Sequence, residues 1–206
     1  MEPKHKLPLR SVRLEALGDG IFAVAMTILV IELKWPQLAN ASFAAFSSSF
    51  HQILPELLCY MISFIVLGIM WFGHRMMFEY IGKTNRHFIF LGVLFYMMVC
   101  LVPFSTRFVA ENALQWGTIL VYGSNLSLCN LTLYAQWSYG IKRPHFLERE
   151  LPDEVRKEAR ISFLISPVVY AIAIVISVWL PIVSIGIFII TPMLYLIPNK
   201  LDKYLP

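Results

Sequence analysis

The longest uncharged segment of the chain constrains the fold most strongly. It covers residues 161–199 and contains no Asp, Glu, Lys, Arg or His. An α-helix rises about 1.5 Å per residue, so this segment is far longer than one helix needs to cross a hydrocarbon core about 30 Å thick. Leu180 and Pro181 stand near its middle, and proline disfavours helix at the residue before it. The segment therefore predicts two membrane-spanning helices joined by a tight turn at these two residues.

The composition extends this interpretation to the whole chain. Hydrophobic residues make up 58% and charged residues 15% of the 206 positions, and the mean hydropathy is +0.66. An exterior surrounded by lipid needs this apolar surface, whereas an exterior in water does not. The net charge of +4 comes from basic residues that flank apolar runs, which favours membrane orientation over nucleic-acid binding. We expect an integral membrane protein without a nucleic-acid partner.

The apolar runs predict an all-α, polytopic membrane protein with six transmembrane helices. The first four helices are expected at about residues 12–33, 54–80, 87–105 and 113–139, and the last two come from residues 161–199. The segments between the runs are short, so no large soluble domain fits between them. We therefore expect a single six-helix transmembrane domain over residues 1–206.

The basic residues give this layout an orientation. If the N-terminus is cytoplasmic, only Lys34 and Arg107 of the 17 basic residues fall outside. Adding or removing a helix would scramble this asymmetry, so the positive-inside rule supports six helices with both termini in the cytoplasm. The expected inner residues are Lys4, Lys6, Arg10, Arg13, Arg75, Lys83, Arg86, Lys142, Arg143, Arg149, Arg156, Lys157, Arg160, Lys200 and Lys203.

Two connecting segments also carry expectations. Residues 36–52 contain no acidic residue and no basic residue other than His51, and their phenylalanines suggest a loop lying at the outer membrane interface. Residues 142–160 mix both charge signs, with Glu154 and Glu158 near Arg156, Lys157 and Arg160. This mixture predicts a short solvated helix that leads into helix five.

The residues do not favour an enzyme. An intramembrane serine protease needs a serine nucleophile with a histidine or lysine at depth, but the five histidines lie at or near helix ends or in loops. The HExxH pattern of metalloproteases does not occur, and the cysteines show no zinc-site spacing. We expect no catalytic residue, no bound metal and no cofactor.

Helix one carries the most informative residues. Asp19 lies between two glycines, one turn deeper than Glu15, and a charge at that depth is costly unless it is paired. We favour a structural or gating role for Asp19. Val24, Thr27 and Ile31 have the spacing i, i+3, i+7 and share one helix face. The spacing alone favours ordinary helix packing for this stripe.

The beginning of helix one, RLEALGDGIFAVAMTILVIEL, resembles the first helix of the transmembrane protein 175 family of lysosomal potassium channels and their bacterial relatives. The family signature is Arg-x-x-x-Phe-Ser-Asp. Arg13 and Asp19 match this signature, whereas Leu17 and Gly18 replace Phe and Ser. The loss of the hydroxyl at residue 18 affects the hydrogen-bond network that the resemblance implies.

Two further motifs are similar to the same family. Trp71 and His74 in helix two match a Trp-x-x-His pattern, and Pro103 with Phe104 matches the end of helix three. The resemblance covers the whole six-helix layout, although its specific motifs lie in the first half of the chain.

The resemblance implies a potassium channel of the single-repeat, bacterial type in the plasma membrane. It implies a homotetramer in which helix one lines a central pore that potassium ions permeate without a TVGYG filter, a motif that this sequence lacks. By position, Val24, Thr27 and Ile31 would form rings around the pore and a hydrophobic constriction. Arg13, Asp19, Trp71 and His74 would form a network that holds helix one against its neighbours.

A second class of function stays open at this point. A small secondary transporter or a non-conducting membrane scaffold would also need several apolar helices. Transporters usually show inverted repeats and broken helices near the midplane. Pro103, Pro167 and Pro192 could break helices, but they form no paired pattern.

Overall fold

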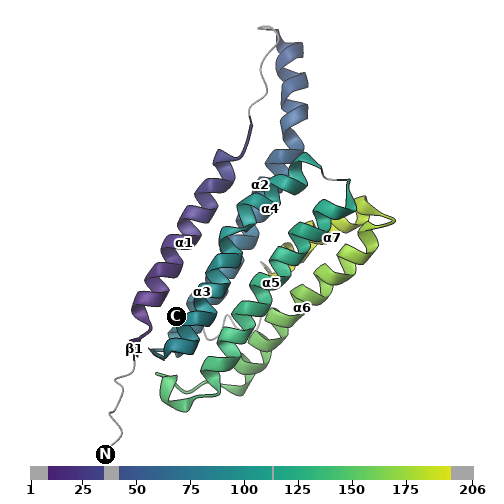
Figure 1. Ribbon diagram of the computed structural model, residues 1–206. Coiled ribbons are helices and arrows are strands. Elements are labelled where there is room, and N and C mark those ends of the chain that lie inside the picture. Colours follow the sequence, from purple (N-terminus) through teal and green to yellow (C-terminus); the bar gives the residue numbers. More distant parts are fainter. Residues whose placement is uncertain (1–8, 35–41, 113, 196–206) are drawn as a thin grey trace, which may run out of the picture.

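The computed structural model describes residues 9–34, 42–112 and 114–195. Within them the chain forms seven α-helices, two short strands and one 3-10 turn. Figure 1 shows the helices running roughly side by side, with α1 at one side, α6 and α7 at the other, and α5 between. The elements are β1 (Leu9–Arg10), α1 (Val12–Ile31), α2 (Phe43–Tyr80), β2 (Lys83–Thr84), α3 (Arg86–Cys100), α4 (Val102–Glu111), α5 (Trp116–Ile141), η1 (Pro144–Phe146), α6 (Asp153–Ser177) and α7 (Pro181–Tyr195).

The helices α3 and α4 together form one membrane span. Only Leu101 separates them, and the combined segment Arg86–Glu111 is long and apolar enough to cross a bilayer. Pro103 lies in the first turn of α4; proline has no N–H, and its ring clashes with the carbonyl four residues earlier, so the helix is interrupted there. Counting α3 and α4 as one span gives the six-helix arrangement that the sequence predicts.

Hydropathy and length do not mark all six segments equally. Four of them qualify as candidate spans in the described residues, namely α1, most of α2, α3 with α4, and α6. The helix α7 is apolar but has 15 residues, and α5 contains buried polar residues such as Asn125 and Gln136. Both helices nevertheless pack against α6 (Figure 1).

The helix α2 is longer than predicted. It begins at Phe43, where the Ser42 side chain accepts a hydrogen bond from the Ala45 amide at 3.2 Å, a common way to start a helix. The expectation of an interfacial loop is therefore wrong for residues 43–52, and residues 35–41 lie outside the described part of the chain. With 38 residues, α2 exceeds the length that a bilayer core needs, and its N-terminal part projects beyond the other helices (Figure 1).

The predicted division of the uncharged segment is confirmed. The helix α6 ends at Ser177 and α7 begins at Pro181, where proline is tolerated because the first helical residue needs no intrahelical N–H bond. The charged residues before the segment do not form a separate helix. They are the first turns of α6, which begins at Asp153.

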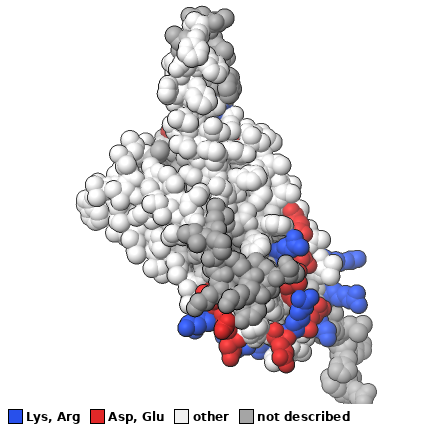
Figure 2. Space-filling view, turned by 180° about the vertical axis from the view of Figure 1, so that it is seen from behind, with Lys and Arg blue, Asp and Glu red and all other residues white. Residues whose placement is uncertain are grey.

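The charged side chains gather at one end of the molecule, which we call the basic end (Figure 2). There, β1 and β2 form a two-stranded antiparallel pairing that the all-α prediction did not include. Backbone bonds from Gly82 N–H to the Phe146 carbonyl (3.0 Å) and from Glu148 N–H to the Tyr80 carbonyl (2.9 Å) join the α2–α3 and α5–α6 connections. Lys34 and Arg107 lie at the opposite end, as the charge pattern predicts.

Candidate functional site

The helix α1 has one packed face and one exposed face. The packed face consists of residues that repeat every three to four positions and lie against α2, α3 and α4, namely Leu14, Gly18, Phe22, Ala25 and Leu29. Because residues on an α-helix are about 100° apart, Val24, Thr27 and Ile31 point about 150° away from this face. Val24 is 57% exposed and Ile31 is 76% exposed in the single chain.

The exposed stripe has one polar group. The Thr27 hydroxyl donates to the Val24 carbonyl at 2.8 Å, which uses its only hydrogen. Its oxygen lone pairs therefore stay available as acceptors on the exposed side. A face of this kind contacts lipid, water or another subunit.

Asp19 and Trp71 connect α1 to α2. The Trp71 indole Nε1–H donates to Asp19 Oδ1 at 2.8 Å, and the Arg75 guanidinium lies 5.8 Å from the centre of the Trp71 ring. Asp19 thus has a partner from helix two, Trp71, which is one of the residues of the network that the resemblance implies. The contact fixes the basic-end half of α1 against α2.

His74 belongs to a second, separate chain of hydrogen bonds. The Tyr96 hydroxyl donates to the Leu14 carbonyl at 2.7 Å and lies 2.8 Å from His74 Nε2. Because the hydroxyl has only one hydrogen, the His74 Nε2–H donates to the Tyr96 oxygen. The other ring nitrogen, Nδ1, is buried and has no partner among the described residues. The three helices α1, α2 and α3 meet at this bond chain.

Tyr96 occupies the space that the family serine would fill. A Cβ added to Gly18 would lie 2.8 Å from the Tyr96 hydroxyl oxygen and 2.5 Å from His74 Cε1, both closer than normal contacts. The glycine therefore makes room for a hydroxyl that comes from α3 instead of α1. Sequence reasoning missed Tyr96, because no motif connects residues so far apart in the chain.

Arg13 does not join the other three predicted network residues. It is exposed at the start of α1 and has no hydrogen bond or ion pair with any residue that the structure describes. Its spacing of eleven residues from Val24 corresponds to three helical turns, so Arg13 lies on the side of the exposed stripe. The predicted role of Arg13 stays a prediction.

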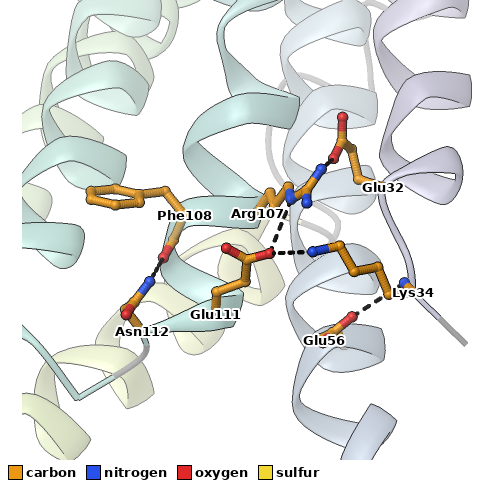
Figure 3. Close-up of polar contacts among 7 residues, drawn as sticks. All are labelled: Glu32, Lys34, Glu56, Arg107, Phe108, Glu111 and Asn112. Atoms are coloured by element: carbon orange, nitrogen blue, oxygen red, sulfur yellow. Dashed lines mark hydrogen bonds and ion pairs between the residues drawn. The ribbon is translucent and has the colours of Figure 1, made fainter. Parts of the chain in front are cut away.

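An ion-pair cluster holds the other end of α1 (Figure 3). Arg107 of α4 pairs with Glu32 through Nη1 and with Glu111 through Nε at 3.1 Å. Lys34 Nζ also pairs with Glu111 at 3.1 Å, and the Lys34 backbone N–H donates to Glu56 of α2 at 3.4 Å. Glu32 is therefore engaged by Arg107 within its own subunit and is not a free carboxylate at the end of the stripe.

The fold and these contacts define a multi-pass helical membrane protein whose first helix is held at both ends and exposed along its middle. A family model described as "Endosomal/lysosomal potassium channel TMEM175" matches residues 13–103. This match covers α1 with Arg13 and Asp19, α2 with Trp71 and His74, and α3. The resemblance found in the sequence is confirmed: the chain is similar to the TMEM175 channels in sequence and in fold.

Relatives and solved structures agree with this assignment. A potassium channel of Chryseobacterium sp. (strain P1-3) is 29% identical over 91% of this chain and 93% of its own length. A potassium channel of Streptomyces collinus is 28% identical over 80% of this chain and 81% of its own length. The crystal structure of a lysosomal potassium-selective channel TMEM175 homolog from Chamaesiphon minutus superposes with a TM-score of 0.78 at 25% identity, covering 90% of this chain and 96% of that one. The family and these relatives are ion channels, not enzymes.

Proposed function

We propose that the chain is one subunit of a potassium-permeable cation channel, and that several copies form a ring with α1 nearest the axis. The observation that carries this proposal is the exposed stripe of α1. The helix lies at the side of the bundle, and Val24, Thr27 and Ile31 point away from its packed face. Other copies of the chain can enclose a stripe in that position. A ring is the symmetric way to do so, and we propose a homotetramer.

The stripe has the chemistry of a gated cation path. In a four-fold ring, Val24, Thr27 and Ile31 would form three layers about 4.5 and 6 Å apart along the axis, from the rise of the helix. The two aliphatic layers would form a constriction that disfavours water and ions. The Thr27 layer would present oxygen lone pairs, because each hydroxyl hydrogen is bonded to the Val24 carbonyl. Such oxygens can replace part of the water shell of potassium.

The contacts at the two ends of α1 support this role. The Asp19–Trp71 bond and the Glu32–Arg107 ion pair join α1 to α2 and α4. A helix held in this way keeps its stripe at a fixed rotation, as a narrow pore requires. Arg13 lies on the exposed side near the basic end.

The charge distribution supports an orientation and a location. We place the basic end in the cytoplasm, since basic residues are enriched on that side of membrane proteins. Both termini are then cytoplasmic, and the chain forms a single domain over residues 1–206. The bacterial relatives match over nearly their whole length, which supports a multi-pass protein of the bacterial plasma membrane. The expected partners are potassium ions, lipid and other copies of the chain.

The decisive experiment is current recording from the purified protein in a planar bilayer with unequal potassium and sodium. We expect a reversal potential that shifts toward the potassium equilibrium potential. Val24→Asn and Ile31→Asn should hydrate the aliphatic layers and raise conductance or leak. Thr27→Val should lower conductance or potassium preference. A matched control is Val168→Asn. Val168 is 58% exposed, and its helix, α6, lies on the other side of the bundle from α1.

The same recordings test the alternative. A small secondary transporter would give saturable, coupled flux instead of unitary currents, and a scaffold would give none. If the three stripe variants and the control all carry the parent current, α1 does not line the ion path. The proposed pore would then be wrong, whatever the protein conducts.

A further inference from the structure

The helix α4 is a short segment whose direction is not determined by the helix before it. Only Leu101 separates it from α3, and Pro103 in its first turn interrupts the helical hydrogen bonds. A proline in such a place lets the chain change direction. The position of α4 therefore depends on its contacts with the other helices.

A buried polar cluster of five side chains holds the first half of α4. The Thr106 hydroxyl donates to the Ser63 oxygen of α2 at 2.8 Å, and the Ser63 and Tyr122 hydroxyls lie 3.0 Å apart, which connects α5. The Asn125 amide of α5 donates to the Ser105 oxygen at 3.1 Å. All five residues are buried. Satisfied polar networks in a low-dielectric interior favour one geometry, so α2 and α5 together determine where α4 begins.

The second half of α4 reaches the end of α1. Arg107 directly follows Thr106, and its Nη1 pairs with Glu32. Its Nε pairs with Glu111, one turn further along α4, at 3.1 Å (Figure 3). The fork of a guanidinium is rigid, so the contact with Glu111 orients the nitrogen that meets Glu32. Arg107 is therefore held by its own helix and presented to α1.

Glu32 comes directly after Ile31, the last layer of the exposed stripe. Because successive residues on a helix point about 100° apart, Glu32 can contact α4 while Ile31 stays on the exposed side. The Glu32 N–H donates to the Ile28 carbonyl at 3.1 Å and closes the last turn of α1. Helix ends fray, and a side chain bound to a neighbouring helix opposes this. The ion pair with Arg107 therefore keeps the turn that carries Ile31 helical and fixes its rotation.

We propose that Arg107 is a positioning residue for the Ile31 layer, and that α4 transmits the position of the buried polar cluster to this layer. Arg107 does not belong to the stripe; it acts through Glu32 on the turn that carries Ile31. The Ile31 layer affects ions only if α1 lines their path, so this inference rests on the proposed function.

Lys34 separates a positioning role from an effect of charge. Its Nζ lies 3.1 Å from Glu111, and its side chain is 65% exposed. Lys34→Gln removes the same charge from the same ion-pair cluster as Arg107→Gln does, yet it leaves both contacts of Arg107 in place. A positioning role predicts that only Arg107→Gln changes the current. Arg107→Lys should restore part of it, because a lysine can pair with Glu32 but lacks the second contact of the guanidinium.

Unitary potassium currents in planar bilayers at low ionic strength measure the effect, because exposed ion pairs are least screened there. We expect Arg107→Gln and Glu32→Ala to raise the conductance by similar factors, since each releases the last turn of α1. A charge effect alone would raise the cation current in the first variant and lower it in the second. In an Ile31→Asn background, Arg107→Gln should cause no further change, because residues that act through one element are not additive.

A matched pair of threonines tests the buried polar cluster. Thr106→Val removes the bond to Ser63 and should raise the conductance as Arg107→Gln does. Thr191→Val is the control. Thr191 and Thr106 are both 5% exposed, but the Thr191 hydroxyl donates within α7, to the Ile187 carbonyl at 2.7 Å. The control should carry the parent current.

Hydrogen–deuterium exchange of the purified protein gives a readout that needs no current. The amides of residues 28–33 should exchange about twofold to fivefold faster in Arg107→Gln than in the parent, as expected for the loss of one exposed ion pair. In Lys34→Gln they should exchange at the parent rate.

The outcomes distinguish this inference from the proposed channel. Equal current changes in Arg107→Gln and Lys34→Gln, opposite changes in Arg107→Gln and Glu32→Ala, equal currents in the two threonine variants, or parent-like exchange in Arg107→Gln would each overturn the inference. Any of these results, with a current that Ile31→Asn alters, leaves the proposed channel intact. Faster exchange in Arg107→Gln, with a current that Ile31→Asn does not alter, contradicts the proposed pore instead.

Discussion

Exchanging a hydroxyl between residues 18 and 96 tests how α1 is held by α2 and α3. The double variant Gly18→Ser/Tyr96→Phe moves the hydroxyl from α3 to α1. Gly18→Ser alone adds a Cβ that would lie 2.8 Å from the Tyr96 oxygen and 2.5 Å from His74 Cε1, and a hydroxyl beyond it. Tyr96→Phe alone removes the acceptor of His74. The double variant relieves the contact with residue 96 and returns an acceptor to the space beside His74.

The structure gives the expected sizes of these effects. Tyr96→Phe leaves the buried His74 Nε2–H unpaired. Hydrogen bonds between membrane helices contribute about 0.6 kcal/mol on average and up to about 1.7, and a buried unsatisfied donor costs about 1–3 kcal/mol. We therefore expect the free energy of unfolding to fall by about 1–2 kcal/mol. Gly18→Ser should lower it by about 1–3 kcal/mol through overpacking. The double variant should lose at least about 1 kcal/mol less than the sum.

The assay is unfolding by SDS in mixed micelles, followed by circular dichroism, for the parent, both single variants and the double variant. Gly186→Ala is the control, because no atom lies within 4 Å of the added Cβ and alanine favours helix over glycine. It should be as stable as the parent or slightly more stable. If the double variant loses as much unfolding free energy as the two single variants together, then residues 18 and 96 do not share one space. Tyr96 would then not be the source of the hydroxyl beside His74.

Two further predictions concern the contacts at the ends of α1. Asp19→Ala and Trp71→Phe each remove the 2.8 Å hydrogen bond between α1 and α2. Both variants should reduce the tetramer fraction in native mass measurements more than they change the reversal potential. A stable tetramer with altered ion preference would instead place Asp19 in the ion path. Arg107→Gln removes the ion pair with Glu32. It should lower the thermal midpoint slightly, and the difference should shrink at high salt because exposed ion pairs are screened; a difference that persists in high salt would contradict this.

Hydropathy and charge were sufficient to predict the architecture. Apolar runs locate the spans because lipid tolerates few unpaired polar groups, and the basic residues fix which ends lie together. The break before Pro181 was predictable because proline restricts the residue before it. The extension of α2 was not predicted, since residues 43–52 lack a charge boundary and a regular apolar period. The cap by Ser42 was the available signal.

The site was predictable only as far as local spacing reaches. The i, i+3, i+7 spacing correctly places Val24, Thr27 and Ile31 on one face, because helix geometry alone determines it. The Tyr96 contact depends on how α3 crosses α1, which no local pattern encodes. Arg13 matched the family motif, yet within one chain it meets neither Asp19 nor His74. A motif shows which residue types are shared but not which of them touch.

The two ends of α1 and its middle therefore serve different purposes. The polar contacts lie at Asp19 and at Glu32. The side chains of the exposed stripe between them make no hydrogen bond or ion pair outside α1 among the described residues. Substitutions in the stripe should therefore leave the stability of a single subunit nearly unchanged, because they remove few intrasubunit contacts. Substitutions at the ends should act first on stability. If Ile31→Asn, at a residue 76% exposed, destabilises the isolated subunit as much as Trp71→Phe does, then the stripe is packed within the subunit and is not available to line a pore.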